Sequence, residues 1–387
     1  MRYSDNIFGR LLKPVSRRQF DASVVRHEAD AYDKEFRSWN HMVLLIFAQL
    51  SGVSGLRDLE AVWNANSNHH YHLGAGKIAR STVSDANARR PVAVFGETFS
   101  RLSSLADRVV RREGEAMLRL IDSTPVPLSA AIDWVKSNGR IKGLKLHVVY
   151  DPVSDTPTHI EITDANINDV TIGERFPIQP GFMHVFDKAY CKYPWWTAIH
   201  EASATFVTRQ KISSKFRAIS KRKPRRCNGD GFKIIDEAEV KFVSKGNSKL
   251  AIPLRRIRLR RDDGPKITLI TNDMERSAVE IASFYKKRWQ IELLFRWIKQ
   301  HLDITTFLGR NQNAIRLQIV AAMIAYLLLR LAARENLVKI PIIRLAGLIA
   351  DRLFLRMPIA KIDKPPDVHP SKPKPAYSLD QLEFDYA

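Results

Sequence analysis

Two aspartates lie where short apolar segments of the sequence end. Asp122 closes the apolar run of LRLIDST, and Asp187 closes that of HVFDKAY. Both runs predict strands, and a carboxylate at the end of a buried strand is costly to desolvate unless a positive group meets it. A divalent metal ion is one such group. Taken singly, each aspartate could equally be a simple strand-end cap.

A third carboxylate lies on a helix predicted over 277–301, together with three other polar side chains. The segment SFYKKRWQIELLFRWIKQHL carries Tyr285, Arg288, Glu292 and Lys299. At about 100° per residue, these four positions fall within roughly 60° of one another on one helix face. Such a stripe could simply meet water. It could also present a metal ligand and phosphate-binding groups side by side.

The hydrophobic pattern between residues 115 and 210 predicts the elements that would position the two aspartates. Three strands, a fourth strand, a helix and a fifth strand are expected at about 117–122, 142–151, 157–164, 182–187, 193–202 and 204–209. This order predicts an α/β fold and is compatible with a ribonuclease H-like mixed sheet.

A basic segment separates these strands from the helix that carries Glu292. Residues 209–226 hold nine Lys or Arg and no acid. Alternating stretches follow, which predict an antiparallel β unit. Its strand RRIRLRR places Arg256, Arg258 and Arg260 on one face and Ile257 and Leu259 on the other. A solvated face is the plain interpretation, but dense basic tracts favour phosphate contact. The predicted contacts are Lys221, Arg222, Lys223, Arg225, Arg226, Arg256, Arg258 and Arg260.

The first hundred residues read as helical, with helices expected at 39–52, 55–65 and 81–91. A Ser or Thr N-cap, a basic end and a Pro stop mark the last of them. Short helices before a polar, basic helix suit a helix-turn-helix-like DNA reader, and a plain helical bundle fits as well. Arg80, Arg89 and Arg90 are the predicted DNA contacts of this region.

Composition limits the partners and the compartment. The 387 residues carry 62 Lys+Arg against 41 Asp+Glu, a formal net charge of +21, which favours a polyanion such as nucleic acid over a merely soluble basic protein. Two cysteines exclude a disulfide framework and favour a reducing compartment. The most apolar stretch has only 13 residues between Arg316 and Arg330, whereas a membrane span needs roughly 20. It predicts a core helix and no membrane partner.

We therefore expect five segments. They are a helical DNA-binding domain, an α/β region, a basic β-rich region, a second helical region, and a disordered Pro/Lys-rich tail, at 1–105, 106–208, 209–277, 278–356 and 357–387.

The Y-x2-R-x3-E-x6-K signature, behind one strand-end Asp and a second Asp in a D-x-x-Y context, resembles the DDE transposases of the insertion-sequence-four family. The resemblance covers about 115–340 and implies a metal-binding triad of Asp122, Asp187 and Glu292. It also implies that Tyr285, Arg288 and Lys299 contact DNA, and that a β-rich insertion, 209–277, separates the last two acids. The segments 106–208 and 278–356 would then be the first and second parts of one catalytic domain. One departure is visible, because many relatives have Arg-Gly where this chain has Lys188 and Ala189.

The chemistry implied is DNA strand cleavage and strand transfer at the terminal inverted repeats of an insertion sequence. Two divalent ions can activate the attacking oxygen and stabilise the leaving one. An all-oxygen ligand set suits Mg²⁺, with Mn²⁺ as a substitute. We expect double-stranded DNA as partner, a homodimer assembled on it, and a place at the bacterial nucleoid in the cytoplasm. The alternatives are a catalytically inactive DNA-binding derivative and a ribonuclease H-like nuclease without strand transfer.

Overall fold

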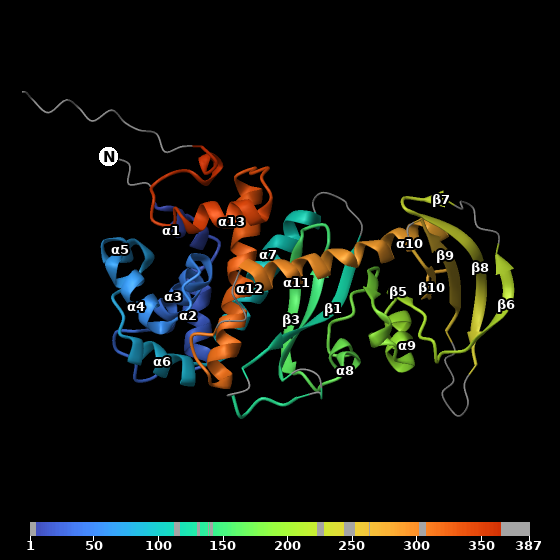
Figure 1. The fold of residues 1–387 in the computed structure, drawn as a ribbon, viewed down its shortest axis with the longest axis horizontal. Helices are drawn as coiled ribbons and strands as arrows, with labels where there is room; N and C mark the ends of the chain where they lie inside the picture. Colours follow the sequence, from blue (N-terminus) through green and yellow to red (C-terminus); the bar gives the residue numbers. More distant parts are fainter. Residues whose placement is uncertain are drawn as a thin grey trace, which may run out of the picture.

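One mixed β-sheet forms the centre of the protein. The fold comes from a computed structural model, which describes residues 5–111, 117–129, 132–137, 139, 142–222, 228–243, 252–262, 264–301 and 307–364. Within these residues the sheet has ten strands in the order β3-β2-β1-β4-β5-β10-β9-β8-β6, with β7 paired to β8. Helices cover both faces of its first half, and a helical region lies beyond β3 (Figure 1).

The first five strands form a ribonuclease H-like arrangement. They are β1 (Leu118–Pro127), β2 (Gly143–Asp151), β3 (Thr156–Asp164), β4 (Met183–Phe186) and β5 (Thr205–Arg209). The first three strands are antiparallel neighbours, whereas β4 runs parallel to β1 and β5 parallel to β4. The predicted α/β fold class is therefore confirmed.

One strand boundary differs from the prediction, because Asp122 does not end β1. The strand continues to Pro127, since residues 123–127 pair with residues 143–147 of the antiparallel neighbour β2. The parallel pairing with β4 does stop beside Asp122, at Ile121↔Phe186. Asp122 thus lies where β1 runs past the end of β4.

The basic insertion adds its strands to the same sheet. They are β6 (Phe216–Arg222), β7 (Asn228–Gly229), β8 (Phe232–Phe242), β9 (Leu254–Arg261) and β10 (Lys266–Thr271). All of them pair antiparallel, as expected, and β10 also pairs antiparallel with β5. The insertion is therefore continuous with the catalytic sheet through backbone hydrogen bonds.

Two hydrophobic clusters occupy the two faces of the sheet. On one face, Leu120 shares a cluster with Ile291 of α11 (Trp289–His301), which follows α10 (Ala278–Lys287). On the other face, Ile121 shares a cluster with the residues of α8 (Asp169–Gly173), η2 (Lys188–Tyr190) and α9 (Tyr193–Glu201). Because side chains alternate along a strand, Asp122 lies on the α11 face and Ser123 on the α8 face.

The N-terminal helices pack around a helix from the far end of the chain. They are α1 (Ile7–Leu12), α2 (Arg17–Arg26), α3 (Ser38–Ser51), α4 (Leu56–Ala65), η1 (Ser67–His69), α5 (His70–Leu73), α6 (Arg80–Arg89) and α7 (Val92–Arg111). Together with α12 (Gln312–Glu335), all of these elements except η1 contribute to one hydrophobic cluster. The expected domain boundary at residue 105 falls inside α7.

Helix α12 is the apolar stretch singled out in the sequence. By length and composition it is the one described helix that could cross a membrane, and α3 with α4 would be a second candidate only as a span bent by 100°. Of the most apolar window of α12, 89% is buried inside the protein, so the prediction of a core helix is confirmed.

Two details differ from the sequence-based prediction at the ends of elements. No Ser or Thr caps α6, which begins at Arg80 after Ala79, and Glu60 of α4 accepts the Arg80 N–H at 3.1 Å instead. The expected disordered tail begins as ordered chain after α13 (Ile342–Ala350), because η3 (Ile359–Lys361) buries Ile359. Residues 365–387 lie outside the described part of the chain.

Candidate active site

Asp122 lies within β1 beside the end of β4, and Asp187 lies just beyond that end. Asp187 directly follows β4 and is the N-cap of η2. The Asp122 carboxylate accepts the N–H of Ser123 at 2.8 Å. Burial raises the pKa of Asp122 to about 6; the Ser123 N–H and Arg288 oppose this shift, while Asp187 and Glu292 add to it. The three carboxylates of the predicted triad are therefore electrostatic neighbours.

Arg288 joins two of these carboxylates. Its guanidinium lies 3.0 Å from an oxygen of Asp122 and 2.6 Å from an oxygen of Glu292. Arg288 follows α10, and its N–H bonds to the Tyr285 carbonyl three residues back. Helices α10 and α11 still follow one line across the sheet (Figure 1). The local tightening at Arg288 divides the single helix predicted over 277–301 in two.

Tyr285 precedes Arg288 and Glu292 along the two helices, and Lys299 follows them. Arg288 is 5.9 Å from the centre of the Tyr285 ring. Burial raises the pKa of Tyr285 to about 12, with Arg288 lowering it and Asp187 raising it further. Lys299 lies about two helical turns beyond Glu292, and burial lowers the pKa of its amine. It has no ion-pair partner among the described residues, which leaves it available to an anion.

The donor set suits a divalent cation, but the carboxylates do not yet form a cage. Within the described residues, no three His, Cys, Asp or Glu side chains are grouped closely enough to hold a metal ion. The Arg288 guanidinium contacts two of the three carboxylates that would have to converge. Neighbouring carboxylates repel one another, and this repulsion adds to the raised pKa of Asp122. A hard cation with oxygen ligands would relieve the repulsion. The chemistry of the donors fits such an ion, and Arg288 now contacts two of the three donors.

Three arginines of β9, Arg256, Arg258 and Arg260, lie on the sheet face opposite the one that α10 covers, because Ile257 and Leu259 fill the core on the α10 side. Arg256 pairs with Asp236 at 3.1 Å and Arg258 lies 3.8 Å from the same carboxylate. Arg260 is exposed and forms no ion pair within the described chain. Only the last two keep an exposed guanidinium for phosphate.

Of the basic residues predicted on the preceding tract, two are described. Lys221 is exposed on the edge strand β6, whereas Arg222 donates to the Met274 carbonyl at 3.0 Å. Lys223, Arg225 and Arg226 lie outside the described residues. Charge counting also passed over Arg255, which is buried against Glu237 at 2.9 Å and therefore supports the fold.

The three arginines predicted to contact DNA around α6 differ in their surroundings. Arg80 is exposed, and Arg89 is half exposed and pairs with Asp33 at 2.5 Å. The assignment of Arg90 is wrong, because its side chain is only 2% exposed. It bonds to Asp33 at 3.0 Å and to the carbonyls of Arg37 and Phe36. Arg90 therefore ties α6 to the segment before α3 and cannot reach DNA.

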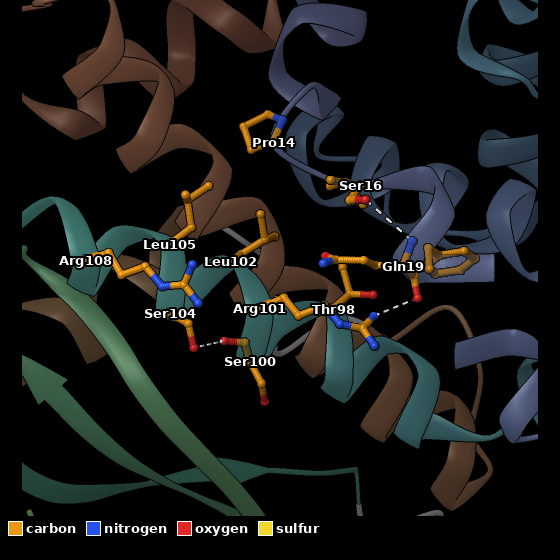
Figure 2. Close-up of a pocket in the computed structure, with 12 residues that line it drawn as sticks. Pro14, Ser16, Gln19, Thr98, Ser100, Arg101, Leu102, Ser104, Leu105 and Arg108 are labelled. Carbon is orange, nitrogen blue, oxygen red and sulfur yellow. Dashed lines mark hydrogen bonds between the residues drawn. The ribbon is translucent and has the colours of Figure 1, made fainter. Parts of the chain in front are cut away.

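A pocket of about 410 Å³ opens between α7 and the α1–α2 turn. Figure 2 shows Ser16 and Gln19 on one side and the side chains of Arg101 and Arg108 on the other. Arg101 is tied down by the Gln19 carbonyl at 2.9 Å and by Glu97 at 2.8 Å. None of the predicted catalytic carboxylates lines this pocket.

Comparison with known proteins gives the family. The model described as "Transposase DDE domain" matches residues 113–328, more than half of the chain, and one described as a domain of unknown function (DUF4372) matches residues 4–76. The Sinorhizobium fredii protein named "Putative transposase y4zB" is 58% identical over 304 residues, which cover 79% of this chain and 85% of that protein. This chain therefore belongs to the DDE transposase family.

A second curated relative agrees with this assignment. "Probable transposase for insertion sequence element IS5377" of Geobacillus stearothermophilus is 30% identical over 263 residues, which cover 66% of this chain and 68% of that protein. The solved piggyBac transposase synaptic complex with hairpin DNA has a TM-score of 0.45 and 11% identity over 99% of this chain and 90% of that chain.

Sequence reasoning passed over three residues beside the two aspartates. Ser123 and Asp169 are hydrogen-bonded at 2.8 Å, and Tyr190 is fully buried in η2. Ser123 and Tyr190 could have been found from the sequence, since Ser123 follows the first Asp and Tyr190 completes the D-x-x-Y motif. No sequence feature identified Asp169, because only the fold brings it to β1.

Proposed function

We propose that this protein is an active transposase. It binds the terminal inverted repeats of its own insertion sequence, cuts the DNA strand there and joins the freed 3′-hydroxyl to target DNA. The observation that carries the proposal is the contact of Arg288 with both Asp122 and Glu292, with Asp187 as an electrostatic neighbour of Asp122, in a chain of the DDE family.

In this proposal each residue of the cluster has a distinct task. Asp122, Asp187 and Glu292 hold two Mg²⁺ ions, or Mn²⁺ in their place, and these ions supply charge stabilisation at the attacking and leaving oxygens. Lys299 and Tyr285 bind DNA phosphate beside the carboxylates. Arg288 neutralises Asp122 and Glu292 until the ions and the DNA backbone are present.

The segments of the chain divide DNA binding and DNA cleavage between them. The helical region 1–105 recognises the element ends, because a metal-binding triad carries no sequence information. The basic insertion 209–277 contacts phosphates, and residues 106–208 with 278–356 cut. Double-stranded DNA is the partner, a homodimer forms on paired ends, and the protein acts at the nucleoid in the bacterial cytoplasm.

Cleavage of duplex DNA carrying the flanking element ends, with and without Mg²⁺, tests the proposal. We expect metal-dependent nicking at the element boundary and joined products with target DNA. Asp122→Asn, Asp187→Asn and Glu292→Gln should each abolish both steps while DNA affinity stays nearly intact. Binding without any cleavage by the wild-type chain would support the inactive derivative. Cleavage without joined products would support a plain nuclease.

A further inference from the structure

The short helix α8 contacts both aspartate-bearing segments from the face of the sheet opposite α11. Asp169, its first residue, accepts a hydrogen bond from the Ser123 hydroxyl at 2.8 Å. The N–H of the same serine donates to the Asp122 carboxylate at 2.8 Å. A continuous chain of hydrogen bonds therefore runs from α8 through β1 to the Asp122 side chain.

Asp169 is itself held in place. Lys145 of β2 lies 3.0 Å from the same carboxylate oxygen and also donates to the Ile167 carbonyl at 2.9 Å. Both charged side chains are largely buried, at 14% exposure for Lys145 and 23% for Asp169. A pair this sheltered holds its geometry better than an exposed one, so the acceptor for Ser123 is fixed relative to β2.

The other end of α8 contacts the Asp187 segment. A Cβ at Gly173 would lie only 2.8 Å from Cδ1 of Tyr190, so the helix backbone rests directly on that ring. Tyr190 is fully buried, and its N–H donates to the Asp187 carbonyl at 3.0 Å. Glycine at 173 is therefore what permits the close approach of α8 to the turn that follows Asp187.

We propose that α8 sets the relative position of Asp122 and Asp187, with Asp169, Ser123 and Tyr190 as positioning residues that act through backbone and ring contacts. This inference rests on the proposed function, since it assigns the two aspartates to a common metal site. Outer partners of this kind orient metal ligands, and their loss commonly weakens metal binding by about 10- to 100-fold.

The test measures Mn²⁺ affinity by electron paramagnetic resonance on the full chain with element-end duplex DNA, so that phosphates can draw Arg288 from the carboxylates. Ser123→Ala and Asp169→Asn should each weaken Mn²⁺ binding about tenfold and leave DNA affinity unchanged. Ser123→Thr, which keeps the hydroxyl, should bind Mn²⁺ as tightly as the wild type. Gly173→Ala should weaken it through the ring contact.

Glu174→Gln is the matched control, because Glu174 directly follows α8 and pairs with Lys192 at 2.6 Å, without contacting Ser123. It should leave Mn²⁺ affinity at the wild-type value. Combining Ser123→Ala with Asp169→Asn should weaken binding no more than one change alone, because both break the same bond. Unfolding temperatures identify any variant that simply loses its fold, and Ser123→Ala is the smallest change.

The outcomes separate this inference from the proposed function. If Asp122→Asn leaves Mn²⁺ affinity intact, the metal site itself is elsewhere and the proposed function fails. If Asp122→Asn abolishes Mn²⁺ binding but folded Ser123→Ala and Asp169→Asn bind as tightly as wild type, the positioning role of α8 is overturned.

Discussion

In the protein without DNA, Arg288 pairs with two carboxylates, whereas on DNA it is expected to contact the DNA. Its guanidinium contacts the carboxylates of Asp122 and Glu292 at 3.0 and 2.6 Å. A half-buried carboxylate without a partner is costly, so an internal cation stabilises the site when no metal is bound. The same contact must be released before the carboxylates can share a divalent ion.

Asp122→Asn should change how stability depends on pH. Because burial raises the pKa of Asp122 from 3.8 to about 6, its proton is bound more tightly in the folded chain. Its contribution to the free energy of unfolding is greatest below pH 4 and falls as pH rises through about 6. Relative to wild type, the free energy of unfolding of the metal-free Asp122→Asn variant should therefore rise by up to about 3 kcal/mol as the pH increases from below 4 to above 6.

Denaturant unfolding of both proteins across pH 4–8 measures this gain. Taking the difference cancels the buried histidines, such as His41, whose pKa is lowered to about 3 by burial. A difference that does not vary with pH would contradict the raised pKa of Asp122.

Arg90→Gln should unfold the helical region rather than weaken DNA binding selectively. The change leaves Asp33 paired only with the half-exposed Arg89 and removes bonds to two carbonyls, and breaking a buried pair costs about 3–5 kcal/mol. Arg80→Gln, at an exposed position of the same helix, should leave the thermal midpoint unchanged and weaken DNA binding. Equal midpoints for the two variants would contradict the structural role of Arg90.

Residue types and spacing were enough to predict that Arg288 and Glu292 lie together, because helix geometry brings residues four apart onto one face. They were not enough for Arg90, since its partner Asp33 lies far away in the chain and only the folded structure joins them. The contact of Arg288 with Asp122 was missed for the same reason.

At the level of elements, periodicity located the strands but not their ends or partners. β1 was predicted to stop at Asp122, because the apolar run ends there, yet pairing with β2 extends it. The joining of β10 to β5 could not be predicted either. Strand pairing depends on contacts between distant segments, which local patterns do not encode.

The arginines of β9 allow a graded prediction. Arg258→Gln and Arg260→Gln should each lower the slope of log affinity against log salt by about 0.9, the value for one lost phosphate contact. Arg256→Gln should change the slope less, because that guanidinium is paired with Asp236 and mostly buried. Fluorescence anisotropy on specific and scrambled duplexes at several salt concentrations measures this. Equal slopes for all three variants would show that exposure does not decide the contact.

For the whole molecule, α12 makes the helical region and the sheet inseparable. It shares one hydrophobic cluster with α3 and α7, and its Tyr326 hydroxyl donates to the Asp155 carbonyl in the β2–β3 turn at 3.1 Å. A fragment that ends near residue 105 would lose this packing and cut α7. Recognition of the element ends therefore has to be tested in the full chain.

Two full-length variants allow such a test of cleavage in trans. Both ends of an element must be cut together, so we expect a dimer on paired ends in which one subunit reads the end that its partner cuts. Asp187→Asn lacks a triad carboxylate but keeps its recognition surface. The double variant Arg80→Gln/Arg89→Gln keeps the triad and lacks two of the basic groups expected to read the end.

Each variant alone should fail to cleave paired ends, and mixing them should restore cleavage to about a quarter to a half of the wild-type rate if subunits exchange freely before binding. The reason is geometric, because only a mixed dimer can place an intact triad opposite an end held by an intact reader. Gel analysis of cleaved ends against mixing ratio measures the rescue, which should peak near equal amounts. If no ratio restores cleavage while both variants still bind DNA and stay folded, each subunit cuts the end that it reads.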